Sequence, residues 1–261
     1  MKKRFVLLFI LIACHLNMLQ AESAVPHIGF TIDLNGTIMQ RDDLDFGYLL
    51  ADGSDEEIQN TIFVSFRRFL QFLEELKVEG KLTYHIAFNS YCKTPEVFPL
   101  SAELLSRALK QEIKMGHLDE NNSLYVVDDK QPITSPEAIL DFLKSNTLTI
   151  MRGSFVRWQK HGYLSEGGKP LFMNTSAGLF GIGWDDNLKV PKWGNDVFIF
   201  QPLTPQGEPI PYEQAETWCT MVNTVDSMTN ENYFIELFID TIQRNQEKYP
   251  ELGQILSGQN P

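Results

Sequence analysis

The chain has 261 residues, of which 43% are hydrophobic and 21% are charged. This composition supports one folded domain of ordinary size and excludes a chain that is disordered throughout. With 34 acidic and 22 basic side chains the formal charge is −12, which argues against binding nucleic acid by neutralising its phosphates. Three cysteines, Cys14, Cys92 and Cys219, are too few for a disulfide-rich scaffold.

The N-terminal segment has the pattern of a secretory signal peptide. Basic residues at positions 2–4 precede an apolar run at positions 5–13, which is too short for the roughly 20 residues that span a bilayer. We expect a signal peptide over residues 1–21 and an exported protein, periplasmic or secreted. In the alternative, residues 11–14 resemble a lipoprotein signal and Cys14 carries a lipid anchor. In an oxidising compartment Cys92 and Cys219 could pair.

The first half of the remaining chain alternates strand and helix patterns. A buried strand is expected at 28–32, followed by a turn and a polar stretch at 41–57. Apolar residues at steps of three and four predict a helix over 58–76. Further strands are expected at 82–88 and 124–127. Further helices are expected at 101–115 and from Ser135 to residue 143, with Pro136 in the first turn.

The second half begins with a less regular segment, 149–174, which suggests an inserted loop or hairpin. Strands are then expected at 179–183 and 197–200, and helices at 213–228 and 232–248. The alternation predicts a single α/β domain over residues 22–261, a Rossmann-like three-layer sandwich with a mostly parallel sheet. Sheets of this kind bind ligands at the carboxyl ends of their strands.

Polar side chains follow three of the predicted strands at the point where each strand ends. If these strands share one parallel sheet, the side chains meet at one edge; they are Asp33, Asn89, Ser90, Asp185 and Asp186. Three carboxylates brought together cannot all stay ionised unless a cation lies among them. Ligation by oxygen alone is typical of Mg²⁺, so the sequence predicts a magnesium site at this edge.

These segments resemble motifs of the haloacid dehalogenase (HAD-like) superfamily of phosphatases and phosphotransferases. Residues 28–37 are similar to its opening motif, a buried strand followed by Asp-x-Asp-Gly-Thr, and residues 181–186 resemble its closing motif, a strand ending in an acidic pair. Ser90 stands approximately where the second motif has Ser or Thr, and Lys169 where the family has a lysine. The resemblance covers about residues 28–200. The short stretch at 41–57 then implies a minimal cap and a site open to a phosphorylated small molecule or macromolecule.

The resemblance also implies a role for each matching residue. Asp33 would be the nucleophile that forms an aspartyl-phosphate. Mg²⁺ would be held by Asp33, Asp185, Asp186 and the backbone carbonyl of Asn35. Phosphoryl oxygens would be bound by Ser90, or by Asn89 in its place, and by Lys169.

Asn35 departs from the family pattern. Phosphatases of the family have an aspartate here that protonates the leaving group and then activates water, and an amide can do neither. General acid–base help of this kind contributes about 10²–10⁴ in rate. We therefore expect a slow Mg²⁺-dependent phosphohydrolase or phosphotransferase. The alternative is a non-catalytic HAD-like binding protein of the cell envelope or secreted fraction.

Other interpretations of the same residues stay open. Asn35-Gly36 is also typical of a hairpin turn, and residues 185–187 could form a simple polar turn. A second acidic pair, Asp128 and Asp129, follows the strand at 124–127, with Lys110 or Lys114 as its lysine. We prefer Asp185 and Asp186, because a further strand at 197–200 follows them. A structural domain without a metal is the remaining possibility.

Overall fold

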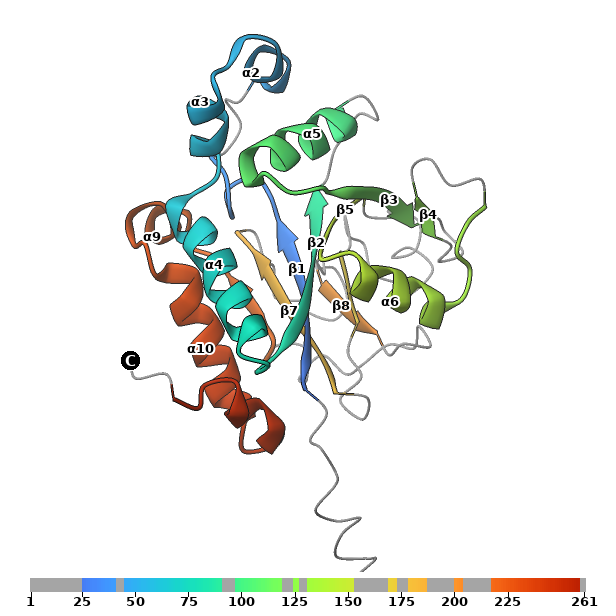
Figure 1. Ribbon diagram of the computed structural model, residues 1–261, viewed down its shortest axis with the longest axis vertical. Helices are drawn as coiled ribbons and strands as arrows, with labels where there is room; N and C mark the ends of the chain where they lie inside the picture. The colour runs from blue at the N-terminus through green and yellow to red at the C-terminus, as the bar shows by residue number, and fades with distance from the viewer. Residues whose placement is uncertain are drawn as a thin grey trace, which may run out of the picture.

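A computed structural model describes residues 25–40, 45–90, 97–118, 124–126, 131–152, 169–172, 178–186, 200–203 and 217–258. Its main sheet has seven strands in the order β4-β3-β5-β2-β1-β7-β9 (Figure 1). Their bounds are β1 His27–Asp33, β2 Thr83–Ser90, β3 Lys114–Leu118, β4 Leu124–Val126, β5 Leu148–Arg152, β7 Leu179–Asp185 and β9 Cys219–Met221. All neighbouring strands are parallel except β3 and β4. The predicted α/β fold with a mostly parallel sheet is confirmed.

Helices lie on both faces of this sheet. Their bounds are α2 Phe46–Asp52, α3 Asp55–Asn60, α4 Val64–Val78, α5 Val97–Leu109, α6 Pro136–Ser145, α9 Thr224–Thr229 and α10 Tyr233–Asn245. On β2, Phe88 packs against Phe66 of α4, whereas the preceding Ala87 clusters with Ile139 of α6. Successive strand residues point to opposite faces, so α4 and α6 cover opposite faces. The helix α10 lies beside α4 (Figure 1).

A second, two-stranded parallel sheet is formed by β6 (Lys169–Phe172) and β8 (Phe200–Leu203). The strand β6 also lies against β1 and β7 of the main sheet. The strand expected at 197–200 is therefore described only from Phe200 onward, and it joins this small sheet. The neighbour that extends the main sheet beyond β7 is instead β9.

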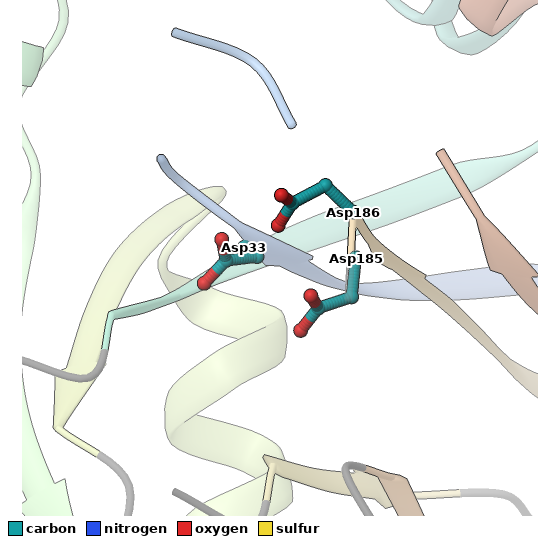
Figure 2. A group of neighbouring side chains, drawn as sticks. All are labelled: Asp33, Asp185 and Asp186. Atoms are coloured by element: carbon teal, nitrogen blue, oxygen red, sulfur yellow. The ribbon is translucent and has the colours of Figure 1, made fainter. Parts of the chain in front are cut away.

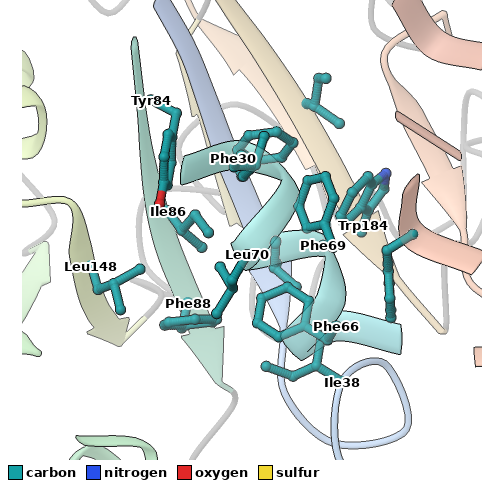
Figure 3. Close-up of a cluster of buried hydrophobic side chains, with 14 of the residues drawn as sticks. Phe30, Ile38, Phe66, Phe69, Leu70, Tyr84, Ile86, Phe88, Leu148 and Trp184 are labelled. Atoms are coloured by element: carbon teal, nitrogen blue, oxygen red, sulfur yellow. The ribbon is translucent and has the colours of Figure 1, made fainter. Parts of the chain in front are cut away.

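Aromatic side chains fill the layer between the sheet and the helices α4 and α10. Figure 3 shows the part of this layer beside α4. Phe69 of α4 lies at its centre, with ring centroids 5.3 Å from Phe30 of β1 and 4.9 Å from Trp184 of β7. Phe238 of α10 is 5.9 Å from Phe69. All four side chains are fully buried, and such ring pairs contribute about 0.5–1.5 kcal/mol each beyond burial. This packing holds β1 and β7 together on one side.

Two buried histidines occupy the amino-terminal part of β1 and β2. The His27 ring is hydrogen-bonded to Thr83 Oγ1 and to the His85 ring, each over 2.8 Å. Burial lowers the pKa of His27 to about 4, with a further contribution from Lys144. Burial lowers the pKa of His85 to about 3, and the positive charges of Lys144 and of His27 in its protonated form act in the same direction. Both rings are therefore neutral at pH 7.

The continuous helix expected over 58–76 is wrong, because the chain leaves the helical path between α3 and α4. A capping box of Ser54 and Glu57 starts α3. At its end Ile62 forms an antiparallel bridge with Met39, and the amide of Phe63 donates to the carbonyl of residue 38 over 2.8 Å. These backbone contacts with the loop after β1 end α3.

Other predicted elements are confirmed or corrected as follows. The strands at 28–32, 82–88, 124–127 and 179–183 and the helices at 135–143 and 232–248 are confirmed as β1, β2, β4, β7, α6 and α10. The helix expected over 101–115 ends at Leu109, where Lys110 has a φ of 54°, and β3 follows. The helix expected over 213–228 is wrong, since residues 219–221 form β9 and α9 is short. Within the segment 149–174, the first residues belong to β5 and residues 169–172 form β6. Its other residues lie outside the described part of the chain, so the inserted loop or hairpin stays a prediction.

Several predictions lie outside the described residues. They are the signal peptide over 1–21 with Cys14, Cys92, and the acidic pair Asp128 and Asp129. Cys219 has no disulfide partner among the described residues, and its pairing with Cys92 stays a prediction. Within the described part of the chain, no helix has the length and apolar character needed to span a membrane.

Candidate metal centre

Three aspartates converge at the carboxyl edge of β1 and β7. The parallel register pairs Ile32 with Trp184, so Asp33 and Asp185 come next on adjacent strands, and Asp186 follows in the turn. Each offers a carboxylate oxygen, and these oxygens lie within 4.8 Å of one another. Figure 2 shows the three side chains projecting into the same region. The structure thus brings together the carboxylates that the sequence predicts at this edge.

The burial of the three carboxylates sets the electrostatics of the centre. Asp185 is only 3% exposed, while Asp33 and Asp186 are half-buried. Ionised carboxylates at this separation repel one another, and burial removes the water that would screen them. A divalent cation among them would replace this repulsion by attraction. The oxygen-only donor set is that of Mg²⁺ or Ca²⁺ rather than of a softer metal.

The chain folds back in a compact loop directly after β1. The carbonyl of Leu34 accepts hydrogen bonds from the amides of Ile38 and Met39, each over 3.1 Å, and the amide of Gly36 donates to the carbonyl of Met39 over 2.8 Å. Both sheet neighbours of β1 run parallel to it. The pair Asn35-Gly36 is therefore not the turn of a hairpin between antiparallel strands.

Gly36 and Thr37 place this loop against Asp186. Gly36 has a φ of +82°, and a Cβ built on it would lie 2.5 Å from Oδ2 of Asp186. The hydroxyl of the buried Thr37 accepts a hydrogen bond of 2.9 Å from the amide of Asp186. Only glycine combines this backbone conformation with such a close approach. The loop after β1 thereby fixes the residue that follows β7.

The remaining predicted site residues lie on the same or neighbouring strands. Asn35 is half-buried, and its bridge to Met39 uses the carbonyl of Leu34 and the amide of Gly36. The bridge therefore does not use the carbonyl of Asn35. By register Asn89 is level with Asp33, and Ser90 ends β2, opposite Arg152 of β5; Lys169 begins β6. For Asn89, Ser90 and Lys169 the structure describes the backbone, so the roles of their side chains stay predictions.

The strand that precedes the second acidic pair ends in a different place. In the sheet order β4 is separated from β1 by β3, β5 and β2, which corresponds to about 19 Å at the usual strand spacing. The strand β4 also runs antiparallel to β3, so it is directed toward the amino ends of the parallel strands, and its last residue, Val126, pairs with Gly116 in the middle of β3. This geometry favours Asp185 and Asp186 as the partners of Asp33.

Two backbone-directed contacts at the centre escape sequence reasoning. The hydroxyl of Thr224 donates to the carbonyl of Gly36 over 2.7 Å, and the amide of Val222 donates to the carbonyl of Asp185 over 2.8 Å. The first contact joins residues 188 positions apart. Val222 and Thr224 lie in the segment 213–228, which the sequence predicts as one helix, and a helical pattern does not indicate contacts with distant loops.

Comparisons of the chain with family models, with curated proteins and with solved structures found no match. The resemblance to the haloacid dehalogenase superfamily therefore depends on the motif residues of the sequence alone.

Proposed function

We propose that the chain is a Mg²⁺-dependent phosphohydrolase or phosphotransferase of the HAD-like type that forms an aspartyl-phosphate on Asp33. The observation that supports this most is the meeting of Asp33, Asp185 and Asp186 within 4.8 Å at the carboxyl edge of two neighbouring parallel strands. In this proposal the fold is a HAD-like three-layer sandwich with a minimal cap. The substrate is a phosphorylated small molecule or macromolecule, and the signal-like pattern at the N-terminus supports an activity in the periplasm or outside the cell.

The residues that would hold Mg²⁺ are the three aspartates and the backbone carbonyl of Asn35. Bound there, the ion would offset the repulsion between the carboxylate nucleophile and the anionic phosphoryl group. Oxygen donors from a strand end, a turn and a backbone carbonyl suit its preference for hard ligands. The phosphoryl oxygens would be bound by Ser90 or Asn89 and by Lys169.

Asp33 would carry the covalent chemistry. One of its carboxylate oxygens attacks phosphorus, the bond from phosphorus to the substrate oxygen breaks, and the alcohol leaves with a proton taken from solvent. Water then attacks phosphorus in the acyl-phosphate, which releases phosphate and restores the carboxylate. An acceptor alcohol in place of water gives phosphotransfer. Because Asn35 supplies no acid or base, both proton transfers depend on solvent, and the reaction is slow.

The direct test is Mg²⁺-dependent release of phosphate from a generic aryl phosphate by the purified protein. Asp33→Asn should abolish it, and so should a chelator. Asp141→Asn, on the exposed face of α6, is the matched control and should keep wild-type turnover. Wild-type protein that turns over no member of a broad phosphoester panel would contradict the proposal.

Asn35 itself favours a second candidate, a non-catalytic binding protein that keeps the fold and the cation site. Here Mg²⁺ or a phosphate mimic raises the melting temperature while turnover stays absent. Asn35→Asp separates the two candidates. A gain of about 10²–10⁴ in rate would show that only the acid–base group is missing. Asp33-dependent turnover in the wild-type protein would contradict the binding-protein candidate.

A further inference from the structure

Residues 222–224 connect the two segments that carry the aspartates. The amide of Val222 donates to the carbonyl of Asp185 at the end of β7, and two residues later the hydroxyl of Thr224 donates to the carbonyl of Gly36. These acceptors belong to segments far apart in sequence. The short connection after β9 therefore restrains the distance between the end of β7 and the loop after β1.

A shift of the Gly36 carbonyl would be transmitted to Asp186. The α-carbon of Gly36 faces the Asp186 carboxylate so closely that no Cβ fits between them. The next residue, Thr37, accepts the hydrogen bond from the Asp186 amide. Thr224 thus holds Gly36, and Gly36 and the adjacent Thr37 both contact Asp186.

The element that presents Thr224 is itself anchored. The hydroxyl of Ser65 in α4 donates to the carbonyl of Ser227 over 2.5 Å. Asn223 caps α9 by accepting from the amide of Val225 over 3.0 Å, and its own amide donates to the hydroxyl of Tyr233 over 2.8 Å. These hydrogen bonds hold the first turn of α9 in place. The hydroxyl of Thr224 can therefore restrain the loop after β1, which it contacts.

We propose that Thr224 is a positioning residue of the cation centre, which holds the loop after β1 so that Asp186 faces the same point as Asp33 and Asp185. This inference depends on the cation site of the proposed function. Thr224 acts through Gly36 and Asp186 and does not itself bind the cation. Its hydroxyl is the essential group, since the contact is a hydrogen bond.

The test compares Thr224→Val, which removes the hydroxyl at nearly constant volume, with Thr224→Ser, which keeps it. Thr229→Val is the matched control, because this threonine also lies in α9 and donates to a backbone carbonyl over 2.8 Å, but it is exposed and its acceptor is Val225. Calorimetric Mg²⁺ titration gives the affinity. The rate of hydrogen exchange at the Asp186 amide measures how firmly the loop after β1 is held, and it does not depend on catalytic activity.

Thr224→Val should weaken Mg²⁺ binding about tenfold, a factor that corresponds to about 1.4 kcal/mol and to the usual contribution of one hydrogen bond. It should also accelerate exchange of the Asp186 amide, while Thr224→Ser and Thr229→Val stay near wild type. Unchanged affinity and exchange in Thr224→Val would overturn the inference, and so would equal losses in the valine and serine variants.

Parallel assays of phosphate release separate this inference from the proposed function. Wild-type protein that binds Mg²⁺ without turnover overturns the phosphotransfer proposal, whereas the tenfold affinity difference would still support the role of Thr224. Turnover in wild-type protein with no effect of Thr224→Val overturns the positioning role alone. Wild-type protein that binds no divalent cation overturns both.

Discussion

Replacing Gly36 by alanine tests the geometry of the cation centre most directly. Two costs arise. Gly36 has a φ of +82°, which disfavours an L residue by about 1–2 kcal/mol. The new Cβ would also lie 2.5 Å from Oδ2 of Asp186, so the carboxylate must retreat beyond 3.0 Å, a shift of at least about 0.5 Å. Metal–ligand distances tolerate about 0.2 Å, so this shift should remove Asp186 from the ligand set.

Gly80→Ala is the matched control for this substitution. Gly80 follows α4 with a φ of +70°, and a Cβ there would meet nothing within 4 Å. Gly80→Ala therefore has the free-energy cost of a positive φ but displaces no carboxylate. In the presence of a chelator both variants should melt a few degrees below wild type, since 1 kcal/mol corresponds to about 2–4 °C in a domain of this size.

Thermal denaturation with and without Mg²⁺ separates the two costs. Wild type and Gly80→Ala should gain stability from Mg²⁺, because a ligand that binds only the folded state raises its melting temperature. Gly36→Ala should gain little or nothing. A wild-type Mg²⁺ response in Gly36→Ala would refute the reasoning that places Asp186 among the ligands.

Two further predictions concern stability. Because the folded-state pKa values of His27 and His85 lie near 4 and 3, below the ordinary value of 6.5, the unfolded chain binds protons first as the pH falls from 7 to 5. The free energy of unfolding should then decrease by up to about 1.4 kcal/mol per pH unit for each histidine. Urea unfolding measures this slope, which His85→Asn should flatten; a midpoint independent of pH would contradict it. Phe69→Ala removes the central ring between β1, β7 and α10 and should cost about 3–5 kcal/mol by the same assay, whereas a loss below 1 kcal/mol would show that the ring packing does not hold these strands.

The strands that carry the aspartates could be predicted from the sequence because each is a short apolar run stopped by acidic residues. Burial on both faces gives such runs a strong signal. The convergence of Asp33 with Asp185 and Asp186 then followed from parallel pairing alone. Nothing more specific than adjacency of the two strands was needed for that step.

Segments whose apolar residues fit both a helical and a strand pattern could not be assigned from the sequence. Ile62 continues the helical spacing of its neighbours, yet its backbone pairs with Met39, so tertiary contacts override the local pattern. Ile113 and Met115 fit the spacing of α5, although β3 begins at Lys114. The strand β9 has three residues, too few for an alternating pattern to show.

Contacts between distant loops carry no local signal at all. The hydrogen bond from Thr224 to Gly36 depends on where two backbone segments meet after folding. Neither residue type indicates the other, since threonine at a helix start and glycine in a turn both have ordinary local reasons.

The separation of Asp33 from Asp185 along the chain has a consequence for biosynthesis. During translation Asp33 leaves the ribosome long before β7 does. For that period Asp185 and Asp186 have not yet emerged, and Asp33 is the one aspartate of the centre that is exposed. A cation can therefore bind among the three aspartates only after β7 has paired with β1. Fragments that end before residue 179 should not bind the cation, whatever their helical content.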